Sequence, residues 1–369
     1  MGEDQRIDYI EKSGERDKTL KKMMKFMLPL LAVMLMISAC GNQANNAGNN
    51  AANDAAAAAG NNAAANDAAA ENAAANNAAA QEEAPAGYVP DELNVQFVPS
   101  QNADTLEAKA KPLEQLLGDK LGIPVSVSVS TDYNVIVEAM ASKQVDVGFL
   151  PPTAYVQAKE KGAAEVLLQA QRKGVEDETG AEKDELVDFY KAMIIVKKDS
   201  PIQSVADLKG KKIAYQNVTS SAGFVWPAAA IMDAGLDPLK DVEPITVKGH
   251  DQGVLAVLNG DVDAAAIFQD ARNIVKGDYP TVFEETRVLT YTEPIPNDTI
   301  AIRPDMDPAW AEKIAQAFIE IGQDEAGHAI IKDIYSHEGY VKSQDSVFDI
   351  VREYGEKVKT ESFRNLAAE

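Results

Sequence analysis

The segment 93–150 reads LNVQFVPSQNADTLEAKAKPLEQLLGDKLGIPVSVSVSTDYNVIVEAMASKQVDVGFL. Three short runs in it have the length and β-branched content of strands, at 93–98, 125–129 and 145–150. Between them, leucines recur at helical spacing from Leu106 to Leu121, and a second helical pattern runs from about Tyr133 to Lys143. Strands that alternate with helices predict a βαβαβ unit, the building block of a parallel sheet with helices on both faces.

The same alternation recurs later in the chain, after a polar excursion at 174–185. The predicted strands are 192–196, 212–215, 244–247, 262–268, 287–291 and 299–302. The predicted helices are 204–208, 224–234, 250–259, 308–321 and 346–358. We therefore expect an α/β protein with two lobes and a cleft between them, crossed by two hinge strands. Small ligands favour such clefts and the carboxyl ends of strands.

The amino-terminal region has the pattern of a bacterial export signal. Lys21, Lys22 and Lys25 precede an apolar run at 26–37, which is followed by small residues and then Cys40, the single cysteine of the chain. This run is too short to span a membrane, as is typical of signal peptides. The residues before Cys40 resemble a lipoprotein box. We expect 1–39 to be the signal peptide of a bacterial lipoprotein, with the true start at Met23 or Met24, and Cys40 to be lipidated.

Residues 40–86 are almost only Ala, Asn, Asp, Glu, Gly and Gln, with no aromatic or β-branched side chain before the end of the stretch. Such a composition cannot build a core, so we expect a disordered, lipid-anchored tether. One cysteine excludes an intrachain disulfide. The 35 basic and 58 acidic residues give a net charge of -23, which argues against binding nucleic acid. His250, His328 and His337 lack the spacing of metal ligands, so we expect no metal and no cofactor.

Eight short motifs, taken in order, resemble the phosphate, phosphonate and phosphite substrate-binding proteins of ABC importers, the PhnD-type family. They are 98–101, 130–133, 144–150, 206–212, 219–224, 249–251, 260–264 and 295–298. The resemblance covers roughly 93–356. It implies a two-lobed periplasmic-binding-protein type II fold, with 87–190 and 290–369 in lobe 1 and 191–289 in lobe 2. It also implies a monomeric, non-enzymatic, extracytoplasmic lipoprotein on the cell membrane, which binds a small phosphorus oxyanion and partners an ABC permease and its ATPase.

Thr219, Ser220 and Ser221 lie after a predicted strand and before a predicted helix. Hydroxyls and unpaired N–H groups at a helix amino terminus can bind an anion, although a serine there is more often an ordinary helix cap. In the family the corresponding residues hold the phosphoryl oxygens. Where the family usually has a further hydroxyl, this chain has Ala222, so one donor is missing.

The resemblance implies three further ligand residues, namely His250, Tyr133 and Tyr190. His250 opens a predicted helix, where its ring could donate a hydrogen bond to a phosphoryl oxygen or simply cap the helix. Each tyrosine stands beside a predicted strand and could instead be a half-buried core residue. Tyr155, on a predicted helix, is expected to serve packing only.

Asp270 and Asp298 are unexpected near a bound anion, because carboxylates repel it unless a positive or protonated group intervenes. In relatives that take aminoalkyl phosphonates, acidic residues here receive the ligand's ammonium, which favours 2-aminoethylphosphonate. Asp298 could instead accept a hydrogen bond from a phosphoryl OH, allowing phosphate or a simple phosphonate. Asp270 could also merely cap a helix.

Three other functions compete with import. A catalytic role lacks a nucleophile elbow, a cysteine nucleophile in the mature fold and a phosphate-cradling Gly-Lys loop. A binding lipoprotein that signals to a membrane kinase would use the same fold. A binding protein for another small compound, such as phosphate, phosphite or a sulfonate, would keep the fold and change the ligand.

Overall fold

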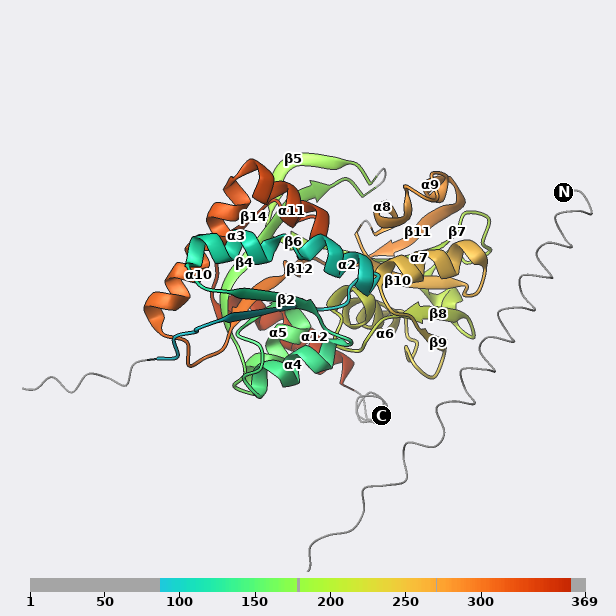
Figure 1. The fold of residues 1–369 in the computed structure, drawn as a ribbon. Helices are drawn as coiled ribbons and strands as arrows, with labels where there is room; N and C mark the ends of the chain where they lie inside the picture. The colour runs from blue at the N-terminus through green and yellow to red at the C-terminus, as the bar shows by residue number, and fades with distance from the viewer. Residues whose placement is uncertain (1–86, 178–179, 270, 360–369) are drawn as a thin grey trace, which may run out of the picture. The chain divides into compact units, whose positions relative to one another are not determined.

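The structure is a computed structural model that describes residues 87–177, 180–269 and 271–359, all within one compact unit, 79–369 (Figure 1). The expected signal peptide, the tether, Cys40 and Asp270 lie outside the described residues and remain predictions. Within the described ranges, no helix combines the length and the apolar character needed to cross a bilayer.

The first of two large sheets has seven strands, in the order β14-β4-β13-β3-β1-β2, with β5 paired to β4. The strands β1, β2 and β3 are parallel, whereas β13 runs antiparallel to both β3 and β4. The strands are β1 (Leu93–Phe97), β2 (Val125–Val129), β3 (Val147–Leu150), β4 (Glu165–Val175), β5 (Glu182–Val187), β13 (Thr299–Ile302) and β14 (Gly339–Lys342). The βαβαβ unit predicted from 93–150 therefore forms the parallel part of this sheet.

Helices cover both faces of this sheet, because strand side chains alternate between the faces. Leu93, Val95 and Phe97 of β1 pack into a cluster with one set of helices, α2 (Ala103–Ala110), α3 (Leu113–Leu121), α10 (Pro308–Gln323) and α11 (Glu325–Tyr335). The opposite face carries α4 (Tyr133–Ala141) and α5 (Pro152–Glu160). We call this sheet and these helices the first lobe. The single helix expected around Leu106–Leu121 is two helices, since Pro112 has no backbone N–H to donate to the turn before it.

The second sheet has five strands, in the order β11-β7-β10-β8-β9, and forms the second lobe with its own helices. The strands are β7 (Ala192–Lys197), β8 (Lys212–Tyr215), β9 (Glu243–Thr246), β10 (Ala264–Phe268) and β11 (Thr286–Tyr291). The helical elements are η1 (Val205–Leu208), η2 (Ser221–Val225), α6 (Trp226–Asp233), α7 (His250–Asn259), α8 (Arg272–Val275) and α9 (Val282–Glu285). Met193 and Ile195 of β7 pack toward α7, while Ile194 and Val196 join a different cluster on the face that carries α6.

That second cluster runs continuously from α6 to α4 and α5, so the two lobes share part of one core. The chain crosses between the sheets at β6 (Phe189–Tyr190) and β12 (Ile295–Pro296), which pair antiparallel. The last described helix, α12 (Asp349–Val358), follows η3 (Asp345–Phe348) and packs against both α5 and α6. Its Tyr354 stacks on Trp226 of α6, with ring centroids 4.3 Å apart. The expected lobe boundaries remain a prediction.

The polar stretch 174–185, in which no strand is predicted, holds the end of β4 and the start of β5, which pair antiparallel. Side chains 182–186 of β5 are exposed, so the hydrophobic pattern that would have revealed the strand is missing. In Figure 1 this hairpin extends from the first lobe toward α8 of the second.

Candidate functional site

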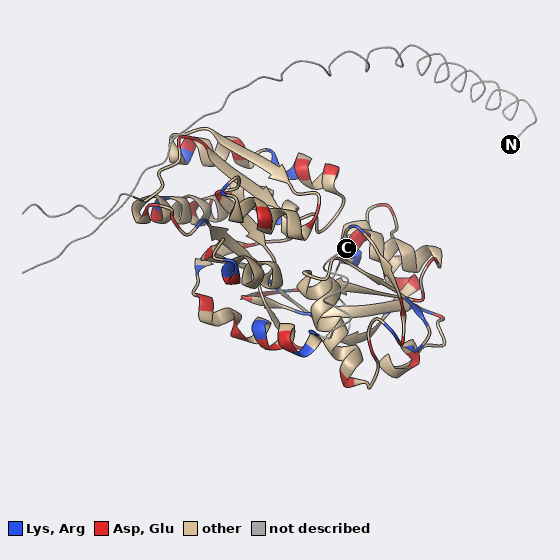
Figure 2. Ribbon diagram, turned by 90° about the horizontal axis from the view of Figure 1, so that it is seen from below, with Lys and Arg blue, Asp and Glu red and all other residues tan. Residues whose placement is uncertain are grey.

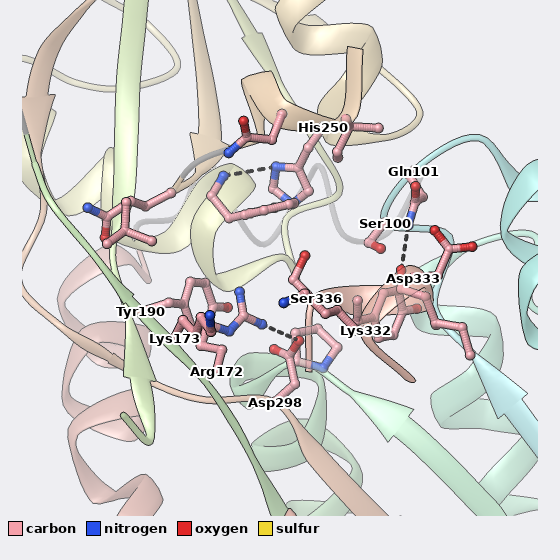
Figure 3. Close-up of a pocket in the computed structure, with 18 of the residues that line it drawn as sticks. Ser100, Gln101, Arg172, Lys173, Tyr190, His250, Asp298, Lys332, Asp333 and Ser336 are labelled. Atoms are coloured by element: carbon pink, nitrogen blue, oxygen red, sulfur yellow. Dashed lines mark hydrogen bonds and ion pairs between the residues drawn. The ribbon is translucent and has the colours of Figure 1, made fainter. Parts of the chain in front are cut away.

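A cavity of about 590 Å³ lies where the carboxyl ends of the parallel strands of both lobes meet. The first lobe contributes Ser100 after β1 and Tyr133 after β2, and the second contributes Ser220 after β8 and His250 after β9. The volume falls within the ~300–1,000 Å³ typical of small-molecule sites. The cavity is therefore the candidate binding pocket (Figure 3).

Ser220 is the one hydroxyl of the 219–221 loop among the described residues that line the pocket. It is buried, its Oγ accepts the N–H of Gly223 at 3.1 Å, and it donates to Oε1 of Gln216 at 3.4 Å. The helix expected after this loop begins as the five-residue π-helix η2 before α6 takes over. Gly223 is needed here, because a Cβ at that position would lie 2.7 Å from Cβ of Gln216.

Thr219 and Ser221 adjoin the pocket but use their hydroxyls elsewhere. Thr219 donates both its N–H and its Oγ1 to Oδ1 of Asn217, at 2.9 and 2.7 Å. Oγ of Ser221 accepts the N–H of Thr153 from the first lobe at 3.0 Å and lies 2.8 Å from Oγ1 of Thr153. The Thr219 hydrogen bonds shape the loop, and the Ser221 hydrogen bonds join the two lobes. The ligand roles predicted for Thr219 and Ser221 remain predictions.

His250 is 4% exposed at the amino terminus of α7, and it lines the pocket. Its Nδ1 accepts the backbone N–H of Phe268 at 3.2 Å, which leaves Nε2 to carry the ring proton. Burial lowers the pKa of His250 to about 3, with Asp298 acting to raise it and Arg172 to lower it. The ring is thus a neutral donor at physiological pH.

Tyr133 and Tyr190 both line the pocket and are both buried. The hydroxyl of Tyr133 donates to Oε1 of Gln216 in the second lobe at 3.0 Å. Tyr190 lies on the crossing strand β6. The guanidinium carbon Cζ of Arg172 lies over its ring, 4.8 Å from the ring centroid. Burial raises the pKa of each hydroxyl, so both are neutral hydrogen-bonding groups. Tyr155 is fully buried, and its hydroxyl donates to Oδ1 of Asp345 at 2.6 Å.

Asp298 lines the pocket and has the positive partner that its position requires. Oδ2 of Asp298 lies 3.5 Å from Nη2 of Arg172, and 3.6 Å from Nε2 of the buried His337 beneath it. Figure 3 shows the guanidinium and the carboxylate side by side at the edge of the pocket. Burial lowers the pKa of His337, so the arginine is the cation of this group.

Arg172 is the main residue that the sequence interpretation missed. It lies on β4, a strand that was not predicted, among polar residues that give no hydrophobic alternation. The signal that was available is the pair of acidic residues, since a carboxylate beside an anion site needs a cation. A sequence alone does not say which of 35 basic residues it is.

The pocket wall has the opposite charge balance to the chain. Its described residues include Lys109, Arg172, Lys173, Lys276 and Lys332 but only three carboxylates, on Glu182, Asp298 and Asp333. Acidic residues are spread over both lobes in Figure 2, consistent with the net charge of -23. A cationic cleft in an acidic protein concentrates small anions.

Four of the contacts between the lobes lie in the segments that follow the strands. The N–H of His250 donates to the carbonyl of Ser100 at 2.9 Å, and Nδ2 of Asn217 donates to Oδ2 of Asp132 at 2.7 Å. The other two are the Tyr133–Gln216 and Thr153–Ser221 pairs. Elements that would approach a ligand from opposite sides are therefore already in contact.

Within the described parts of the chain, no group of three or more His, Cys, Asp or Glu side chains is arranged to hold a metal ion. The pocket instead offers neutral donors, one buried guanidinium and a rim of lysines. Two α/β lobes that enclose such a pocket are the architecture of a type II periplasmic substrate-binding protein.

Comparisons with known proteins identify the family. Residues 95–348 match the family described as the periplasmic substrate-binding protein of a phosphonate ABC transporter, and the chain belongs to that family. It is 28% identical to the phosphate-import protein PhnD of Mycolicibacterium smegmatis over 63% of this chain and 72% of that one. It is 25% identical to the phosphonates-binding periplasmic protein of Escherichia coli over 65% of this chain and 69% of that one.

Solved structures share the fold. A binding protein of a Pseudomonas aeruginosa phosphonate transporter aligns with a TM-score of 0.63 at 19% identity, covering 72% of this chain and 85% of that one. The family is thus one of periplasmic substrate-binding proteins of ABC transporters, and the Pseudomonas aeruginosa protein is a binding component of such a transporter.

Proposed function

We propose that this protein captures a phosphonate or a related phosphorus oxyanion and delivers it to an ABC importer. The observation that carries the proposal is one pocket in which Tyr133, Tyr190, Ser220, His250 and Asp298 meet. Neutral hydrogen-bond donors suit an oxyanion because they stabilise its charge without a large desolvation cost of their own. The names of the relatives include phosphate and phosphonates, which fits this ligand class.

Capture is proposed to occur by closure of the lobes on the ligand. These four contacts join the two lobes, so they would break on opening and form again on closing. A ligand that binds only the closed form shifts the population toward it. The closed form is then the signal that the permease reads, and the lipid anchor proposed at Cys40 keeps the protein at the membrane surface.

The first candidate ligand is an aminoalkyl phosphonate, 2-aminoethylphosphonate. The pocket has room beyond a bare oxyanion, and Glu182, Asp298 and Asp333 offer carboxylates to an ammonium group. A second candidate is an oxyanion without an amine, such as phosphate, phosphite or methylphosphonate. It is favoured by the 3.5 Å separation of Arg172 and Asp298, because a guanidinium this close repels an ammonium at that carboxylate.

Calorimetric titration of the full-length protein tests the function. The protein is purified in detergent and refolded from denaturant to remove bound ligand. It is then titrated with 2-aminoethylphosphonate, methylphosphonate, phosphite, phosphate and an aliphatic sulfonate. Binding of at least one phosphorus ligand, and of none of the sulfonate, supports the proposal. Failure to bind any phosphorus oxyanion would refute it.

The Asp270→Asn variant separates the two ligand candidates. If Asp270 receives an ammonium, the variant binds 2-aminoethylphosphonate roughly tenfold or more weakly, while its affinity for methylphosphonate stays unchanged. Equal affinities for 2-aminoethylphosphonate in the variant and the wild type would remove Asp270 from the site.

A further inference from the structure

The ion pair between Arg172 and Asp298 is the one place in the pocket wall where a buried cation and a carboxylate stand side by side among the described residues. The Arg172 side chain is 9% exposed and that of Asp298 is 19% exposed. Arg172 comes from β4, and Asp298 directly precedes β13, whose neighbour in the sheet is β4. Two adjacent strands therefore hold the pair rigidly at the edge of the pocket (Figure 3).

Arg172 and Asp298 do not form a hydrogen bond with each other. Its 3.5 Å separation is longer than the ~2.7–2.9 Å of a charge-assisted hydrogen bond. Nε of Arg172 is also buried without a hydrogen-bond partner among the described residues. A guanidinium has five N–H groups, and a buried one without partners is costly. Nε itself is enclosed, but Arg172 lines the pocket and no hydrogen bond closes its Nη2 on Asp298, so the outer end of the guanidinium can donate to an anion there.

We propose that Arg172 and Asp298 select a phosphoryl group that carries one proton over a tetrahedral anion that carries none. This rests on the proposed function. Arg172 donates to a P–O⁻ oxygen while Asp298 accepts the hydrogen bond of the P–OH group. A sulfonate offers three acceptors and no donor, so it meets the Asp298 carboxylate with like charge. Arg172 is thus a specificity-determining residue of the site.

The surroundings of the pair agree with this assignment. His250, Arg172 and Asp298 all line the same pocket. The Tyr190 ring supports the guanidinium from one side, and His337 lies beneath the carboxylate. A pair with only a structural role would be closed by a hydrogen bond, and the 3.5 Å separation of this pair is too long for one.

Methylphosphonate and methanesulfonate test the proposal, because they have nearly the same shape and differ in the ability to carry that proton. Phosphate and sulfate form a second matched pair. For the full-length wild-type protein in detergent, we expect each phosphorus ligand to bind at least about a hundredfold more tightly than its sulfur counterpart. Sites built around a ligand hydroxyl reject analogues that lack it by large factors, up to ~10⁴–10⁵.

The Asp298→Asn variant is expected to gain affinity for the sulfur ligands. Its amide can donate to a third acceptor oxygen, so the variant is expected to bind methanesulfonate or sulfate, and to bind the phosphorus ligand more weakly than the wild type does. Since losing one member of a buried pair can prevent folding, the charge-balanced Arg172→Gln, Asp298→Asn double variant is measured beside it. The ratio of phosphorus-ligand affinity to sulfur-ligand affinity is expected to be at least about tenfold smaller in the double variant than in the wild type.

Lys173→Gln is the matched control, because Lys173 is the next residue, lines the same pocket and carries the same charge. It should leave the selectivity ratio unchanged. The proposal is overturned if the wild type binds both members of a pair equally, or if the double variant keeps the wild-type ratio. Absence of all phosphorus-ligand binding by the wild type would instead overturn the proposed function, and this inference with it.

Discussion

Nδ1 of His250 accepts the backbone N–H of Phe268 at 3.2 Å, which joins the amino terminus of α7 to the end of β10 and fixes the ring with Nε2–H as its donor. The same burial that holds the ring neutral ties its titration to folding. Two properties, ligand affinity and the pH dependence of stability, therefore depend on this one residue.

The His250→Asn variant should bind the phosphorus ligand roughly tenfold or more weakly, a loss of ~1.4 kcal/mol or more. Its amide oxygen can still accept the Phe268 N–H, but the shorter side chain cannot place a donor where Nε2 lies. His250→Ala should additionally lose stability, because the buried N–H is left without a partner at a cost of ~1–3 kcal/mol. Calorimetry and denaturant unfolding separate the two effects. Unchanged affinity in His250→Asn would exclude His250 from the site.

The pH dependence of folding stability should also change in His250→Asn. The pKa of His250 is lowered to about 3 in the folded state and is near 6.5 when unfolded, so below pH 6.5 the unfolded chain binds the proton first. The folded state therefore loses stability as pH falls from 7 toward 3. Between pH 7 and 5 the wild type should lose about 2 kcal/mol more than the variant in urea unfolding. Parallel curves for the two proteins would contradict the buried, neutral ring.

Tyr133→Phe should weaken ligand binding and stability together, because the hydroxyl that is removed bonds Gln216 across the lobes. The expected loss of unfolding free energy is ~0.5–1.5 kcal/mol, with affinity reduced several-fold. Tyr155→Phe is the matched control, since it removes a hydroxyl that bonds Asp345 and does not line the pocket. It should lose stability and keep affinity. If both variants lose affinity equally, the effect comes from general destabilisation and not from the pocket.

Arg303→Gln should be strongly destabilising without changing ligand affinity. Nη1 of Arg303 lies 3.1 Å from Oδ1 of Asp146, and both side chains are buried. Removing the arginine leaves the carboxylate unpaired, which typically costs ~3–5 kcal/mol. Urea unfolding should show this loss, while titration of the folded variant should give the wild-type affinity. A loss of affinity in the folded variant would mean that the strand β13, which ends at Ile302, transmits strain to Asp298.

The sequence predicted those parts of the fold in which side-chain pattern and burial agree. Helix α7 begins at His250 and ends at Asn259, as expected, because an amphipathic pattern lies between Gly249 and Gly260, a cap with φ of 79°. The hairpin of β4 and β5 was missed because its outer strand is exposed on most positions and carries no alternation.

The candidate site follows the same rule. Motif positions that immediately follow strands, such as Tyr133, Ser220 and His250, come together because parallel strands end at one edge. Arg172 could not be found in this way, because it lies within β4, and β13, the neighbouring strand that brings Asp298 beside it, is distant in the chain. The sequence likewise does not show that Ser220 lines the pocket while Thr219 and Ser221 bond Asn217 and Thr153, because these contacts depend on the tertiary structure.

The β4–β5 hairpin reaches the second lobe through Asp177, and this contact should control how long the ligand stays bound. Oδ2 of Asp177 lies 2.6 Å from Nζ of Lys191, and Oδ1 accepts Nε2 of Gln269, a pocket residue, at 2.7 Å. Opening the cleft requires these bonds to break, so they slow ligand release more than they affect encounter. Asp177→Ala should raise the dissociation rate several-fold in stopped-flow measurements and leave the association rate nearly unchanged.

Asp184→Ala is the control for that measurement, because Asp184 is an exposed carboxylate on β5 of the same hairpin. It removes the same charge and should leave both rates at their wild-type values. Equal changes in the two variants would assign the effect to the charge of the hairpin. A slower association in Asp177→Ala alone would mean that the hairpin guides the ligand in rather than holding it, because attraction acts on encounter and hydrogen bonds act on release.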